Sequence, residues 1–127
     1  MFSTMSMFSL TAITLAAVSL VEFTAAKPVW LEGRETEMNV YAGFRAVIDD
    51  AVSEPATIRV AASTLYRLYV NGEFIGHGPA RGPHGYYRVD EWKTLPWRND
   101  GRNVVAIEVA GYNANSYYVL DQPSFLQ

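Results

Sequence analysis

The dipeptide Asn71-Gly72 constrains the fold more than any other feature of this 127-residue chain. It separates the apolar run Leu68 to Val70 from Phe74 and Ile75. A two-residue type I′ turn requires positive φ at both central residues, and Asn-Gly tolerates these values. The sequence therefore predicts an antiparallel β-hairpin at this point.

A segment rich in glycine and proline follows the hairpin. Between Gly76 and Gly85 the chain has four glycines, two prolines, both of its histidines and one arginine. Glycine weakens a strand and proline cannot donate to a strand ladder, so this density of breakers excludes a helix or a central strand. We expect an ordered loop here.

Period-two alternation of apolar residues is the other strong local signal. Ile58, Val60 and Ala62 lie on one face of a strand expected over Ala56 to Ala62. Helical periodicity is weak after residue 26, and six or seven short strands separated by turn signals predict an all-β sandwich or jelly roll. The other strands expected, besides those of the hairpin, are Val40 to Ile48, Tyr86 to Val89, Asn103 to Ala110 and Ser116 to Leu120.

The two ends of the chain carry their own signals. Met1 to Ala26 contains no Asp, Lys or Arg, and its apolar core Leu10 to Val21 precedes small residues that a signal peptidase accepts. This apolar stretch is shorter than the ~20 residues needed to span a bilayer. We expect a signal peptide at 1–26, with a loose N-terminal extension as the alternative, then a β-sandwich domain at 27–127. Because the chain stops at Phe125-Leu126-Gln127, with apolar residues near its end and no polar tail, we expect a domain truncated at its C-terminus, from a larger secreted or periplasmic protein.

Composition excludes several classes of function. The chain has no cysteine, so disulfides, thiolate metal sites and cysteine nucleophiles are excluded. Ten basic residues are scattered and the net charge is −3, so nucleic acid is not an expected partner. His77 and His84 match no zinc spacing, and neither Asp49-Asp50 nor Asp90-Glu91 supplies enough oxygen ligands for calcium. We therefore expect no metal and no cofactor.

The order of motifs resembles a known family. The segments LYVNGEFIGHGP, YYRVDEW and DGRNVVAIEVAGYN follow one another over roughly Ala61 to Tyr118, about half of the chain. This order is similar to that of the N-terminal sugar-binding-like β-sandwich of bacterial α-L-rhamnosidases, glycoside hydrolase family 78. The Asn-Gly hairpin also occurs in jelly-roll domains of other glycosidases such as β-galactosidases, because it serves turn geometry first. The resemblance implies that the catalytic carboxylates lie on a later (α/α) barrel, beyond the segment that this chain covers.

The residues themselves also argue against catalysis by this chain. Glycoside hydrolysis needs two carboxylates that flank one bond, whereas the adjacent Asp90 and Glu91 point to opposite faces of an extended segment. We expect Asp90 to tie down the loop by accepting backbone or arginine hydrogen bonds.

Sugar recognition needs an aromatic surface and polar groups that bind hydroxyls. The candidates for contact with a rhamnose-containing glycan, or for docking against downstream catalytic domains, are Asn71, His77, Arg81, His84, Tyr86, Tyr87 and Trp92. The prediction is therefore a non-catalytic accessory domain, and the alternatives are an independent carbohydrate-binding module or a jelly-roll domain of another glycosidase such as a β-galactosidase. No membrane partner is expected once the signal is cleaved.

Overall fold

The computed structural model describes residues 23–49, 56–82, 86–93, 95–99, 101–116 and 121–127. These residues form six strands and no helix, which confirms the predicted all-β class. Accordingly, no helix among them is long and apolar enough to cross a membrane. The strands are β1 (Val40–Ile48), β2 (Ile58–Val60), β3 (Leu65–Val70), β4 (Glu73–Gly78), β5 (Asp90–Trp92) and β6 (Asn103–Gly111). The predicted signal peptide, except for residues 23–26, and the predicted strand Ser116 to Leu120, except for Ser116, lie outside the described residues.

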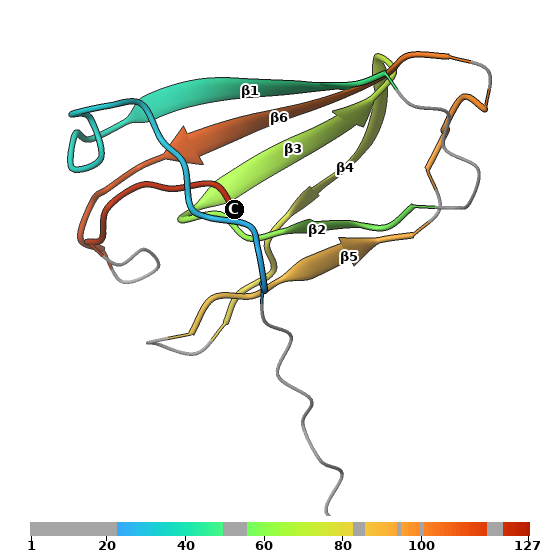
Figure 1. Cartoon of the computed structure of the whole chain (residues 1–127). Coiled ribbons are helices and arrows are strands. Elements are labelled where there is room, and N and C mark those ends of the chain that lie inside the picture. Colours follow the sequence, from blue (N-terminus) through green and yellow to red (C-terminus); the bar gives the residue numbers. More distant parts are fainter. Residues whose placement is uncertain (1–22, 50–55, 83–85, 94, 100, 117–120) are drawn as a thin grey trace, which may run out of the picture.

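The strands form two antiparallel sheets (Figure 1). One sheet has four strands in the order β1-β6-β3-β4, and the other pairs β2 with β5. Residues near the two ends of the described chain extend the second layer, because Leu126 bridges to both Val29 and Ala62. The amide of Val29 donates to the carbonyl of Leu126 over 2.8 Å, and the amide of Leu126 donates back over 2.9 Å.

The core lies between the four-stranded sheet and this second layer. Tyr66, Leu68 and Val70 point inward from β3, and Val109 does so from β6. They pack against Val60, Ala62 and Leu126 from the other side. Full burial of one such aliphatic side chain stabilises the fold by about 1.5–3 kcal/mol, so this alternation supplies much of the driving force.

The hairpin forms as predicted. Strands β3 and β4 are joined by Asn71 and Gly72, with φ values of 53° and 84°. The Asn71 side chain also clamps the turn to its surroundings: its Nδ2 donates to the carbonyl of Pro96 over 2.8 Å, and its Oδ1 accepts from the amide of Val104 over 2.9 Å. Asn71 thus adopts the backbone conformation that the turn requires and also hydrogen-bonds to two neighbouring segments.

The predicted loop Gly76 to Gly85 begins too early. Gly76, His77 and Gly78 belong to β4, and the irregular segment starts only after Gly78. The glycines are tolerated in this strand because other groups occupy the space on their inner side. A Cβ at Gly76 would collide with the ring of Trp92, and one at Gly78 would collide with the carboxylate of Asp90. Glycine in a strand marks such close approach, which composition alone does not show.

Two other predicted strands also need correction. The strand expected over Tyr86 to Val89 is absent from the part of that segment that the structure describes, and the ladder instead forms at Asp90–Trp92. The available partner, β2, sets the position of this strand by placing Trp92 opposite Ile58. The strand expected over Ala56 to Ala62 is shorter, at Ile58–Val60, and Ala62 forms an isolated bridge to the C-terminal segment.

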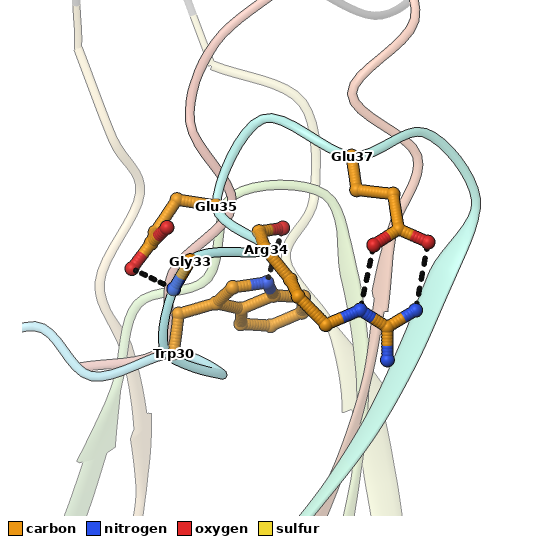
Figure 2. Close-up of polar contacts among 5 residues, drawn as sticks. All are labelled: Trp30, Gly33, Arg34, Glu35 and Glu37. Atoms are coloured by element: carbon orange, nitrogen blue, oxygen red, sulfur yellow. Dashed lines mark hydrogen bonds and ion pairs between the residues drawn. The ribbon is translucent and has the colours of Figure 1, made fainter.

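A compact turn precedes β1 (Figure 2). The Trp30 Nε1 donates to the carbonyl of Arg34 over 3.2 Å, and the amide of Gly33 donates to Glu35 Oε1 over 3.3 Å. Arg34 also donates twice to the Glu37 carboxylate, over 2.6 and 2.7 Å. Because this ion pair is exposed, it contributes little to stability, and the main result of the turn is to hold the Trp30 ring against the core.

Candidate functional site

A buried polar network joins the start of β5 to the core. The hydroxyl of Tyr66 donates to Asp90 Oδ2 over 2.7 Å and accepts from Trp92 Nε1 over 2.9 Å. Burial, together with the hydrogen bond to Asp90, raises the pKa of Tyr66 well above its usual value. Arg88 Nε donates to the other oxygen of Asp90 over 3.0 Å, so the predicted hydrogen bond from an arginine is confirmed. The two oxygens of Asp90 therefore bind two different side chains, and the bond from Tyr66 ties the start of β5 to β3.

Glu91, the neighbour of Asp90, has different partners. Its Oε1 accepts from Arg59 Nε over 2.9 Å, and its Oε2 lies 3.4 Å from Lys93 Nζ. These two cations, Arg59 first, lower the pKa of Glu91. A glycosidase general acid needs the opposite shift, because it must still hold its proton near neutral pH. Asp90 and Glu91 thus have structural partners rather than the arrangement of an acid–base pair.

Two of the predicted site residues serve the fold. Asn71 uses its side-chain amide within the hairpin turn, as described above. Trp92 is partly buried, packs against the core and donates to Tyr66. A ligand reaching either side chain would have to compete with these contacts.

The other predicted residues do not gather at one place. Tyr86 and Tyr87 are 66% and 54% exposed, and they line a hollow beside the last residues of the chain. The ring of Tyr87 meets that of Phe125 edge-on at 4.7 Å, and its hydroxyl donates to Gln122 Oε1 over 3.2 Å. Arg81 is exposed in the segment after β4, and His84 lies outside the described residues.

His77 belongs to a separate surface. Its side chain is exposed on β4 and borders a hollow on the face of the four-stranded sheet that points away from the core. We call this surface the outer face. The residues that border its hollow share no member with those that border the hollow of Tyr86 and Tyr87. Of the predicted candidates, His77 therefore lies on the outer face, and Tyr86 and Tyr87 lie on a second surface. Asn71 and Trp92 instead make turn and core contacts.

Sequence reasoning missed most of the outer face. Its residues come from the outward positions of the alternating strands, where exposed Arg67 and half-buried Tyr69 lie on β3 and exposed Glu108 lies on β6. The apolar alternation that predicts the inward residues also predicts these outward ones, because they occupy the positions in between. The strand order was the missing information, because β1 and β3 become neighbours of β6 only in the folded sheet.

Metal binding has no support in the described part of the chain. Its His, Asp and Glu residues form no group of three that could hold a metal ion. Asp90 and Glu91, considered for calcium from the sequence, are engaged by the cations described above.

Comparison with solved structures identifies a similar protein. The structure superposes on part of the GH78 family rhamnosidase of Bacillus sp. GL1 with a TM-score of 0.74 and 28% sequence identity. The match covers 80% of this chain but only 11% of that enzyme, so the chain corresponds to a small part of it. The resemblance expected from the motif order is thereby confirmed. No protein-family model matches the chain. No curated protein matches it either.

Proposed function

We propose that this chain is a non-catalytic β-sandwich domain of an α-L-rhamnosidase-like glycoside hydrolase. The structural match to a GH78 rhamnosidase over 80% of the chain is the observation that carries the proposal. The partners of Asp90 and Glu91 support the absence of catalysis, because both carboxylates are held by structural contacts. The domain assists hydrolysis of terminal rhamnosides by holding sugar or by docking against the catalytic part of the enzyme.

The proposal includes the organisation of the chain. Residues 1–26 act as a signal peptide, so the enzyme is secreted or periplasmic, and residues 27–127 belong to the accessory domain. The 11% coverage of the similar enzyme supports the view that further domains complete the protein.

Enzymatic assay tests this proposal. The chain and the longest polypeptide that its gene encodes are each incubated with a chromogenic α-L-rhamnoside and with the matching β-D-galactoside. We expect the long polypeptide to hydrolyse the rhamnoside and the chain alone to be silent. Turnover by the chain alone would overturn its non-catalytic role, and a long polypeptide that hydrolyses only the galactoside would overturn the enzyme class.

A further inference from the structure

The outer face carries three rows of side chains that run across the strands. Backbone pairing places Gly43 of β1 opposite Glu108 of β6, Glu108 opposite Arg67 of β3, and Arg67 opposite His77 of β4. All four residues are exposed. We call them the polar row.

A flanking row that contains aromatic or aliphatic side chains lies on each side of the polar row. Residues two apart in an antiparallel strand are separated by about 6.8 Å, so each flanking row lies about 7 Å from the polar row. One flanking row contains Tyr41, Ala110 and Leu65, and the other contains Arg45, Ala106, Tyr69 and Phe74.

Small residues hollow out the middle of this surface. A Cβ at Gly43 would have no atom within 4 Å, and Ala110 of β6 also borders the hollow. Aromatic pairs form its walls. Tyr41 meets Tyr112 edge-on with ring centroids 6.3 Å apart, and Tyr69 lies 5.5 Å from Phe74. Since Tyr41 is 71% exposed, this wall presents apolar surface to solvent.

The polar row is only loosely paired. Arg67 Nη1 lies 3.9 Å from Glu108 Oε2, and the hydroxyl of Tyr69 donates to the same oxygen over 3.3 Å. The side chains of Arg67 and Glu108 are 67% and 60% exposed, so most of their donor and acceptor positions face water. Their opposite charges cancel, so this pair offers hydrogen-bonding groups with little net charge.

This arrangement favours a sugar over a protein partner. Charged residues are depleted from the centre of protein interfaces, where apolar side chains gather. The outer face has charged groups at its centre, Arg67 and Glu108, and the rings of Tyr41, Tyr69 and Phe74 lie in the rows beside them. A neutral pyranose needs both kinds of group, because its C–H face packs on aromatic rings while its hydroxyls bind planar polar side chains.

We propose that the outer face is a binding surface for a neutral pyranose, with the ring seated over Gly43 and Glu108 beside the exposed ring of Tyr41. Glu108 and Arg67, on the next two strands, bind its hydroxyls. The choice of L-rhamnose as the first probe rests on the proposed function, whereas the site itself rests on the geometry of the three rows.

An NMR titration of the ¹⁵N-labelled chain with L-rhamnose, and separately with D-galactose, tests this proposal. We expect L-rhamnose to shift amide signals on the outer face, centred on Gly43, Arg67 and Glu108. The Gly43→Val variant fills the hollow, and its Cβ meets no atom within 4 Å, so we expect a folded protein that no longer binds. Arg67→Gln removes a charged donor and should weaken binding about tenfold.

A matched control separates binding from general charge effects. Arg102 forms an exposed ion pair with Asp49 and does not border the hollow, so Arg102→Gln should bind L-rhamnose as the unmodified chain does. Undiminished binding by Gly43→Val would overturn the proposal. Shifts centred on Tyr86 and Tyr87 would also overturn it, while leaving sugar contact by the domain intact. No shift with either sugar would overturn it, while the enzyme class, which the hydrolysis assay tests separately, would be unaffected.

Discussion

The two faces of the four-stranded sheet differ in what they do, although the same strands build both. On the inner face, Leu68 and Val70 are fully buried, and glycines at Gly76 and Gly78 let neighbouring side chains approach the backbone. On the outer face, Gly43 faces open space. Side chains therefore pack against the glycines of the inner face, whereas the space above Gly43 on the outer face is open.

The two faces therefore carry different information: the inner face reports the fold, and the outer face has residues that the fold does not need. The motif order that resembles rhamnosidases comes mostly from turns and inner-face residues, so it reports the fold. The outer-face residues Arg67 and Glu108 make only exposed contacts and contribute little to stability. They are therefore the residues that a function is able to use.

Truncation of an inner-face leucine gives the largest expected effect. Leu68→Ala should lower the free energy of unfolding by about 2–5 kcal/mol, because it removes a fully buried side chain and leaves a cavity. Leu65, on the outer face of the same strand, is 45% exposed, and Leu65→Ala should cost less than about 1 kcal/mol. Urea unfolding measures both, and equal losses would contradict the division between the faces.

A pair of glycine substitutions makes the comparison sharper. Gly76→Ala should destabilise the domain by about 1–3 kcal/mol, because the new methyl group collides with the ring of Trp92. Gly43→Ala should instead stabilise it by about 0.4–1 kcal/mol, since it meets nothing and restricts the unfolded chain. Thermal unfolding of the two variants should therefore move in opposite directions, and a shift in the same direction would count against the structure.

The buried hydroxyl of Tyr66 predicts a pH dependence. Its pKa is raised in the folded state, so above about pH 10 the unfolded chain loses this proton while the folded chain keeps it. The free energy of unfolding should therefore fall as pH rises past 10, by at most about 1.4 kcal/mol per pH unit from this group. Tyr66→Phe removes this contribution, and an unchanged slope in that variant would show that other groups cause it.

Loss of an outer-face charge gives the smallest expected effect. Glu108→Gln weakens an exposed ion pair, so the free energy of unfolding should change by less than about 1 kcal/mol. Chemical denaturation beside Leu68→Ala provides the measurement. A loss as large as that of Leu68→Ala would mean that the outer face also holds the fold together.

Local sequence signals predicted the parts of the fold that depend on neighbouring residues. The hairpin formed at Asn71-Gly72, where turn chemistry placed it, and the strand Val40–Ile48 has the bounds that were predicted for it. The strand at Asp90–Trp92 was misplaced because its position depends on pairing with β2, about thirty residues earlier, rather than on its own composition.

The candidate site was harder to predict for the same reason. His77 was identified from its unusual loop composition, yet its neighbours Arg67 and Glu108 join it only through the register of three strands. Tyr86 and Tyr87 are exposed as a binding residue must be, but they lie on a different surface. Residue type suggested the chemistry, and only the strand order showed which groups lie together.

The separation of a folding face from a binding face is tested most directly by thermal melts of the chain and of Gly43→Val, each with and without L-rhamnose. A ligand that binds only the folded state raises the melting temperature. We predict that the sugar raises the melting temperature of the unmodified chain, whereas Gly43→Val melts at the same temperature or higher and does not respond to the sugar. An equal rise in both proteins would contradict the account.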